Sequence, residues 1–320
     1  MEFQFAPMEG ITYGMFRKLH HQMFPGTSEY YTPFIAPDQD GSFKPKYLRE
    51  LTMDREEYRL IPQLLVNRAE AFNITADKLH DLGFDEINLN AGCPSGTVYA
   101  KYKGSGMLRN LTEYDQLLDK IFNHAAVKGV QVSIKTRLGI HTSDEFRDLL
   151  NIYNRYPVKR LIIHARTRDG YYKSAPDLES FAEAVGNSRI PVSYNGNVYS
   201  RSDLDKVLSL APNTKAVMIG RGMIRNPALI RELAGGDPLK AEELRTFHDA
   251  LTESWLESGL SPSFTVERMK SLWSYMQGLF PQNRREIKAI MKARTLADYK
   301  AGVSVLFSDG IFQLSNDPML

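Results

Sequence analysis

The strongest constraint on the fold is a regular alternation of short apolar runs with segments of helical spacing. Eight runs rich in β-branched and aromatic residues recur between residues 3 and 220, and several are continuous rather than alternating. Continuous apolar runs are typical of parallel strands that are buried on both faces. The predicted strands are FQFAPM, SEYYTPFI, RLIPQLLV, FDEINLN, VQVSIKTR, KRLIIHAR, IPVSYNG and KAVMIG.

Amphipathic segments lie between most of these strands. The predicted helices span residues 68–82, 112–126, 143–153, 178–185 and 200–210, with helix starts at Thr112–Glu113 and Ser200–Asp203. Eight strands that alternate with helices predict an α/β fold, a (β/α)8 TIM barrel. The alternative is a doubly wound open sheet. Such a sheet more often carries GxGxxG after its first strand, where this chain has APMEGIT.

The pattern changes near Pro238, where strand-like runs end. The predicted helices of this part span residues 241–258, 263–279, 284–296 and 297–306. Such a series predicts a small helical bundle, joined to the barrel by the linker GGDP. We therefore expect a catalytic barrel over residues 1–237 and a helical domain over residues 238–320.

Composition narrows the class of protein. The chain has 320 residues, 42% of them hydrophobic, and a net charge of +2, so a surface for nucleic acid has to be a local patch. A single cysteine excludes an internal disulfide framework and a cysteine-built metal cluster, and it indicates a reducing cytoplasm. The N-terminus lacks the pattern of a secretory signal, and no apolar stretch approaches the length of a membrane span. We expect a cytoplasmic protein without a metal site.

Function in such a barrel is expected at the C-terminal ends of the strands. Taken singly, each polar residue there has an ordinary explanation, such as a turn for NGN or simple packing for Cys93. Together they are hard to attribute to chance, because they follow successive strands. The candidates are Pro7, Met8, Glu9 and Gly10, then Gln63, then Asn88, Asn90 and Cys93, then Lys135 and Arg137, then His164, Arg166 and Arg168, then Asn195, Gly196 and Asn197, and finally Gly220, Arg221 and Gly222.

Two of these features predict the kind of ligand. A buried lysine such as Lys135 requires an anion or an electron-rich ring beside it. The glycine-bearing turns after the seventh and eighth strands, with Arg221 nearby, predict a phosphate site. Position alone therefore predicts a phosphate-bearing ligand at the mouth of a barrel.

With these residues in hand, the chain resembles the tRNA-dihydrouridine synthase family along its whole length. The matching motifs are APMEGIT (6–12), PQLLVN (62–67), INLNAGCPSGTV (87–98), VSIKTRLG (132–139), IIHARTR (162–168), YNGNV (194–198) and VMIGRGMIRNP (217–227). The chain departs from the usual pattern at Ala165, in KYKGSGML with Lys103 and Met107, and in SEYYTPFI. These departures concern which tRNA position is modified and leave the reaction intact.

The resemblance implies a flavin-dependent oxidoreductase with FMN as cofactor and NADPH as reductant. By analogy, Pro7, Met8 and Glu9 would line the flavin. Gln63 and Lys135 would hydrogen-bond its ring, and His164 would lie beside it. The residues that would hold its phosphate are Asn195, Gly196, Asn197, Gly220 and Arg221.

The resemblance also implies the substrate, a uridine within tRNA. Hydride would pass from N5 of FMN to C6 of the uracil, and Cys93 would donate a proton to C5. A thiol with a reference pKa of about 8.5 is largely protonated at neutral pH and can act as this acid. Asn90 and Arg137 would contact the uracil or a neighbouring phosphate.

A uracil stacked in tRNA has to be extruded before it reaches such a pocket, so recognition would rest on RNA shape and backbone contacts. Residues 284–300 carry six Lys or Arg against two acids, and Arg285, Lys288 and Lys292 share one helical face. A solvated helix face is the ordinary explanation, but the resemblance favours tRNA contact. Lys101 and Arg166 would extend the basic path.

Two other functions fit parts of the sequence. A barrel flavoenzyme could act on a small pyrimidine, but the basic helical tail argues against that substrate. An RNA-binding relative without catalysis would not need Cys93, Lys135, His164 and the glycine turns. We expect a monomer that binds tRNA and NADPH and has no membrane association.

Overall fold

The computed structural model describes residues 1–38, 40–42, 44–53 and 57–309. Contacts divide the chain into two compact units. The barrel unit comprises residues 1–7, 28–196 and 205–218, and the helical unit comprises residues 8–27, 197–204 and 219 onward. Each unit combines several separate stretches of the chain, so this division does not test the predicted domains. The domain ranges 1–237 and 238–320 remain a prediction.

The described residues form one sheet in which neighbouring strands run parallel. The strands are β1 (Glu2–Phe5), β2 (Glu29–Tyr31), β3 (Leu60–Ile61), β4 (Gln63–Leu64), β5 (Glu86–Ala91), β6 (Gln131–Arg137), β7 (Leu161–His164), β8 (Val192–Asn195) and β9 (Ala216–Ile219). Each of the eight predicted runs contributes a strand to this sheet.

The sheet closes on itself. Its strand order begins with β3 and ends with β4, and only Pro62 separates these two strands in the chain. Proline has no backbone N–H, so it interrupts the hydrogen-bond ladder without ending the extended chain. The Pro62 carbonyl still accepts a hydrogen bond from the amide of Asn88 at 2.8 Å. The predicted TIM barrel is thereby confirmed, and the open sheet is excluded.

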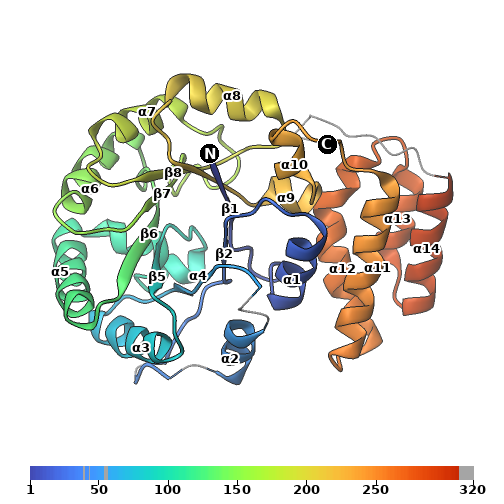
Figure 1. The fold of residues 1–320 in the computed structure, drawn as a ribbon, viewed down its shortest axis with the longest axis horizontal. Helices are drawn as coiled ribbons and strands as arrows, with labels where there is room; N and C mark the ends of the chain where they lie inside the picture. The colour runs from blue at the N-terminus through green and yellow to red at the C-terminus, as the bar shows by residue number, and fades with distance from the viewer. Residues whose placement is uncertain (39, 43, 54–56, 310–320) are drawn as a thin grey trace. The chain divides into compact units, whose positions relative to one another are not determined.

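Helices cover the outside of the barrel, and Figure 1 shows α3, α5, α6 and α7 around the strands. The helical elements that follow the strands are α2 (Pro45–Thr52), α3 (Ala69–Asp81), α4 (Gly96–Ala100), η1 (Gly104–Arg109), α5 (Leu111–Lys128), η2 (Ser143–Glu145), α6 (Phe146–Tyr153), α7 (Leu178–Asn187) and α8 (Arg201–Leu210). Helix α5 begins before the predicted Thr112, because the Asn110 side chain accepts a hydrogen bond from the amide of Glu113 and caps the helix there.

The barrel unit buries its apolar side chains inside the sheet and between sheet and helices. One core cluster brings together residues from five strands or strand ends, all of them at most 5% exposed. Its members are Ala6, Tyr31, Ile61, Ile162 and Met218. A closed and packed interior leaves the ends of the barrel as the places for polar chemistry.

The helical unit consists of helices and turns in its described part. They are α1 (Gly14–Met23), α9 (Arg221–Arg225), α10 (Leu229–Leu233), α11 (Ala241–Glu257), α12 (Pro262–Met276), η3 (Gln277–Leu279), α13 (Arg284–Lys292) and α14 (Leu296–Asp309). The predicted helix 284–296 is wrong in its extent. Ala293 has extended backbone, and the Thr295 hydroxyl accepts the amide hydrogen of Asp298, so a new helix begins there.

A polar cluster with aromatic neighbours holds the core of the helical unit. The buried Tyr299 hydroxyl accepts a hydrogen bond from the Trp273 indole at 2.8 Å and lies 2.6 Å from Nε2 of His248. Burial lowers the pKa of His248, so its imidazole is neutral near pH 7. Within the described part of the chain, no helix is long and apolar enough to span a membrane.

Candidate active site

A ladder of side-chain amides lies at the C-terminal ends of β4 and β5. The Gln63 amide nitrogen donates to Oδ1 of Asn88 at 2.8 Å, and Oε1 of Gln63 accepts a hydrogen bond from Asn90 at 2.8 Å. Asn88 in turn donates to the Ser133 hydroxyl on β6. These side chains are nearly inaccessible, so each hydrogen bond fixes its neighbour. Contact of Gln63 with a flavin ring remains a prediction.

The ladder ends by positioning Cys93. Oδ1 of Asn90 accepts hydrogen bonds from the amides of Gly92 at 3.1 Å and Cys93 at 2.9 Å. The Cys93 carbonyl accepts from the amide and the hydroxyl of Ser105, at 3.1 and 2.8 Å. Gly104 has a φ of +55°, and a Cβ added there would lie 2.8 Å from Cβ of Cys93. The segment after Cys93 therefore packs against it and fixes its backbone on both sides.

Lys135 lies beside Cys93 at the same end of the barrel. Its strand position on β6 pairs with that of Asn90 on β5. Burial lowers the pKa of the Lys135 amine to about 7, the nearby Arg137 charge acts in the same direction, and Cys93 opposes both. The charged form of the amine is therefore much less favoured than in a solvent-exposed lysine, and a bound anion would favour it.

Arg137 joins two loops and is 1% exposed. Its Nε donates to the Gly92 carbonyl at 2.9 Å, and its Nη1 donates to the carbonyls of Thr167 and Tyr171 at 2.8 and 2.9 Å. Its guanidinium also lies 5.4 Å from the ring centre of Tyr172. Three of its donors are thus committed to holding the loop of Cys93 against the loop after β7. Contact of Arg137 with uracil or phosphate remains a prediction.

Arg166 orients His164 at the end of β7. Nη1 of Arg166 lies 3.0 Å from Nε2 of His164, and Nε of Arg166 donates to the Ser174 carbonyl at 2.6 Å. An arginine can only donate, so Nε2 of His164 accepts and the ring proton sits on Nδ1. Arg166 is 2% exposed, so it has little surface to offer RNA, and its predicted tRNA contact remains untested. The ring centre of Tyr172 is 5.9 Å from that of His164.

The predicted phosphate residues fall on both units. In the barrel unit, the Asn195 amide donates to the Met218 carbonyl at 2.8 Å. A Cβ added to Gly196 would lie 2.1 Å from the Tyr194 hydroxyl, so only glycine fits there. In the helical unit, Arg221 donates to Oδ1 of Asn197 at 2.7 Å.

The remaining phosphate residue, Gly220, precedes α9 in the helical unit, and its carbonyl accepts the amide hydrogen of Met223 at 3.0 Å. The next glycine, Gly222, is tightly enclosed. A Cβ there would lie 2.1 Å from the Val198 carbonyl oxygen. The predicted turn thus leaves no room for a side chain at Gly222.

The turn after β1 begins with Pro7 in the barrel unit and continues with Met8 and Glu9 in the helical unit. The Met8 amide donates to the Thr12 hydroxyl at 2.8 Å. Gly10 at its tip has a φ of +84°, a backbone conformation that favours glycine. Within the helical unit, Arg268 donates to the Gly10 carbonyl at 2.8 Å. Flavin contact by the three predicted residues stays a prediction.

The predicted tRNA residues of the tail lie on α13. Arg285, Lys288 and Lys292 are exposed, whereas Ile287 and Ile290 on the same helix are buried. The structure therefore confirms a helix with one basic, solvent-facing side. It contains no RNA, so contact with tRNA remains a prediction.

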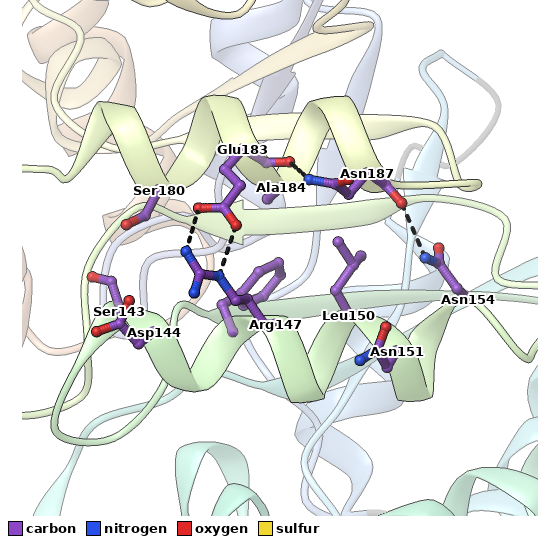
Figure 2. A pocket seen from close by; sticks show the side chains of 11 residues that line it. Ser143, Asp144, Arg147, Leu150, Asn151, Asn154, Ser180, Glu183, Ala184 and Asn187 are labelled. Carbon is purple, nitrogen blue, oxygen red and sulfur yellow. Dashed lines mark hydrogen bonds and ion pairs between the residues drawn. The ribbon is translucent and has the colours of Figure 1, made fainter.

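A cavity of about 240 Å³ lies between α6 and α7, outside the strands. Figure 2 shows Arg147 and Glu183 pointing toward each other across it, with Nε and Oε1 2.8 Å apart. None of the predicted site residues lines this cavity. We therefore assign it no role in the chemistry.

The structure thus brings the predicted Asn90, Cys93, Lys135, Arg137 and His164 together at one end of the barrel unit. Sequence reasoning missed the positioning contacts of Ser105 and Gly104, because only the folded loop reveals them. Arg68, two residues after the third predicted strand, lines a cavity with Lys101 and Lys103, and the same strand-end rule could have pointed to it. Among the described residues, no group of three His, Cys, Asp or Glu could hold a metal ion.

A closed parallel barrel with cysteine, lysine and histidine at its strand ends defines a TIM-barrel enzyme. The profile of the dihydrouridine synthase (Dus) family matches residues 4–298, and the chain belongs to this family of oxidoreductases, which form dihydrouridine in tRNA.

Relatives and solved structures agree. The probable tRNA-dihydrouridine synthase of Staphylococcus aureus is 30% identical over 239 residues, 70% of this chain and 69% of that protein. The probable tRNA-dihydrouridine synthase 2 of Bacillus subtilis is 28% identical over 236 residues, 70% of each chain. Morphinone reductase has a TM-score of 0.54 at 13% identity, covering 77% of this chain and 88% of that one. At that identity, the likeness shows the fold alone.

Proposed function

We propose that this protein reduces the C5–C6 double bond of a uridine in tRNA to 5,6-dihydrouridine, with FMN as cofactor and NADPH as reductant. The observation that carries the proposal is the fixed position of Cys93 beside Lys135. Asn90 holds the Cys93 amide at 2.9 Å, and Lys135 occupies the facing position on β6. A family member with this arrangement has a thiol and a buried amine at the end of the barrel where TIM-barrel enzymes react.

The residues present fit a flavin mononucleotide. Lys135 is a deep amine with a pKa of about 7 that would gain from an electron-rich ring, and Gln63 keeps a second amide hydrogen beyond the one given to Asn88. Asn195, Gly196, Asn197, Gly220 and Arg221 would hold the phosphate, and Pro7, Met8 and Glu9 would line the ring. Bound FMN, once reduced by NADPH, would supply the hydride that reaches C6 of the uracil.

Cys93 would supply the proton. Hydride addition at C6 places negative charge on C5, C4 and O4, and a thiol proton delivered to C5 completes the reduction, with the thiolate left to be reprotonated from solvent. Lys135 would stabilise that thiolate electrostatically. Fixed backbone on both sides of Cys93 keeps the sulfur from turning away during this step.

His164 and the clamp made by Arg137 would shape the pocket for the base. Arg166 donates to Nε2 of His164, so the ring proton of His164 sits on Nδ1. Tyr172 is 44% exposed and lies next to both His164 and Arg137, so it offers a face to an extruded base. On the helical unit, the basic side of α13 would contact the tRNA backbone. We expect the enzyme to act as a cytoplasmic monomer.

The experiment is to incubate the purified protein with NADPH and an unmodified tRNA transcript and to measure dihydrouridine. We expect the unaltered protein to carry a flavin spectrum and to form dihydrouridine. Cys93→Ala should keep the flavin and lose turnover by about 100-fold or more, because a positioned general acid contributes 10²–10⁴. Ser95→Ala, two residues away, is the matched control and should retain activity.

Other outcomes separate the alternatives. Full turnover in Cys93→Ala would remove Cys93 as the acid. A colourless protein that does not take up FMN would rule out the flavin mechanism. Reduction of free uridine but not of tRNA would point to a small-molecule pyrimidine reductase.

A further inference from the structure

A second cavity lies at the same end of the barrel unit as Cys93, and cationic side chains line it. Its volume is about 490 Å³, and its walls are the segment after β4, the segment after β5 and residues 37–38. Arg68, Lys101 and Lys103 contribute three positive charges, and Asp38 contributes one negative charge, which leaves +2. Such an excess of one sign in a concave site attracts an anion.

The start of α3 adds to this attraction. Arg68 is the N-cap residue of the 13-residue helix α3, and no side chain caps the helix there. Asn67 and Ala71, on either side of the helix start, also line the cavity. The amides of the first turn have no partner within the helix, and the helix dipole is positive at this end. The Asn67 amide donates to the Lys101 carbonyl at 2.9 Å and ties the two walls together.

The cations in this cavity also repel one another. The pKa of Lys103 is lowered by burial first and then by the charges of Lys101 and Arg68, and Asp38 only partly opposes this. Like charges held together without equal compensation are costly, and a bound anion removes that cost. These positive charges are therefore energetically more favourable when an anion occupies the cavity than when the cavity is empty.

The cavity is also directly connected to Cys93. Lys103 precedes Gly104, whose position is so close that an added Cβ would lie 2.8 Å from Cβ of Cys93. The next residue, Ser105, donates twice to the Cys93 carbonyl. Residues 103–105 therefore link the wall of the cavity to the backbone of Cys93.

We infer that this cavity binds a backbone phosphate of the tRNA next to the uridine that is reduced. The inference rests on the proposed function and adds Arg68, Lys103 and the start of α3 to its substrate-binding residues. Among the described residues, those that line the cavity include no aromatic ring that could stack on the adenine of NADPH. The phosphate of a ribose chain satisfies the same donors without needing such a ring.

The test is the salt dependence of tRNA binding. We would measure the Kd of an unmodified tRNA transcript by fluorescence anisotropy from low to high salt, for the flavin-loaded protein and for Arg68→Gln/Lys101→Gln/Lys103→Gln. We expect binding about tenfold weaker at low salt, since hydrogen bonds to charged groups are among the strong ones. We also expect the slope of log Kd against log salt to fall by about 1, the value for one lost phosphate contact.

Lys159→Gln/Lys215→Gln is the matched control. Both lysines are exposed and lie within two residues before the start of β7 or β9, at the opposite end of the barrel, so Kd and slope should not change. The flavin spectrum and thermal unfolding verify that each variant is folded. If the triple variant does not fold, the single variants Lys103→Gln and Lys103→Arg replace it. Lys103→Gln should reduce the salt slope, whereas Lys103→Arg should keep the slope of the unaltered protein.

Each outcome decides the question. Unchanged affinity and slope in the triple variant, with normal tRNA reduction by the unaltered protein, would overturn the phosphate site and leave the proposed function standing. An unaltered protein that neither binds nor reduces tRNA would overturn the proposed function itself. A rise in the NADPH concentration needed for half-maximal flavin reduction, with tRNA affinity retained, would assign the cavity to the reductant and overturn the inference.

Discussion

The titration of one buried side chain, that of Lys135, makes the stability of the fold depend on pH. The folded protein releases the Lys135 proton at a pKa of about 7, whereas the unfolded chain keeps it to about pH 10.4. Stability therefore rises with pH between these values, because the unfolded state binds more protons there. Each pKa unit corresponds to about 1.36 kcal/mol, so retaining the charged amine costs on the order of 4 kcal/mol below pH 7.

We predict that Lys135→Met stabilises the flavin-free protein by about 2–4 kcal/mol at pH 6 and by much less at pH 10. Urea unfolding at both pH values measures the difference, with the exposed Lys159→Gln as control. A gain of equal size at the two pH values would contradict a buried, proton-releasing amine. The same substitution should weaken FMN binding. The charged amine would thus favour binding of the ligand although it opposes folding.

Arg137 and Arg166 show where prediction from sequence ends. The strand-end rule located both correctly, and the resemblance assigned them to uracil, phosphate or tRNA. In the structure, they are 1% and 2% exposed and donate to the carbonyls of Gly92, Thr167, Tyr171 and Ser174. A sequence shows that a cation follows a strand, but the carbonyls that capture it come from loops whose paths no local pattern encodes.

Among the secondary-structure elements, the strands could be predicted from the sequence because burial on both faces forces continuous apolar runs. Their connections were less predictable. The sequence predicted a break after residue 296, but the helix already ends at Lys292, because the break depends on the backbone of Ala293 and on the Thr295 cap. The closure of the sheet depends on the two sides of Pro62 pairing with different strands, which only the three-dimensional order shows.

The N-terminal end of the barrel carries a buried ion-pair network that should contribute to stability without affecting catalysis. Glu29, 6% exposed, contacts Arg160 in a close ion pair, lies 3.3 Å from Nε of Arg59 and accepts a hydrogen bond from Gln4 at 2.6 Å. Arg59 also pairs with the buried Glu86 at 2.9 Å. Glu29 and Glu86 begin β2 and β5, and Arg59 and Arg160 directly precede β3 and β7, so the network lies at the end opposite to Cys93.

We predict that Arg160→Met lowers the free energy of unfolding by about 3 kcal/mol, because it leaves Glu29 buried with less compensation. Urea unfolding measures the loss, and the folded variant should keep its turnover. Arg147→Met is the matched control. It breaks the pair with Glu183 in Figure 2, whose side chains are 66% and 46% exposed, and it should have no measurable effect on stability. Equal effects of the two substitutions would contradict the role assigned to burial.

At the scale of the whole molecule, we predict that the basic side of α13 and the cationic cavity each contribute to the binding of tRNA. The net charge of the chain is only +2, so tRNA affinity has to come from such local surfaces. Arg285→Glu/Lys288→Glu/Lys292→Glu should weaken tRNA binding at least tenfold at low salt and reduce the salt slope by about 2 to 3, with helix content unchanged by circular dichroism. Lys159→Glu/Lys215→Glu should have no such effect. If the charge reversal on α13 left tRNA affinity unchanged, this face of the helix would be merely solvated.

Combining the two sets of substitutions tests whether the surfaces hold different phosphates. The cavity belongs to the barrel unit and α13 to the helical unit, and no residue is shared between them. Substitutions at sites without shared partners add within about 0.5 kcal/mol, so the combined variant should show the sum of both losses in binding free energy and in salt slope. A combined loss clearly smaller than the sum would mean that tRNA already disengages from one surface when the other is altered. Additivity would instead mean that the catalytic barrel holds the RNA locally, beside Cys93, while the helical unit holds it independently.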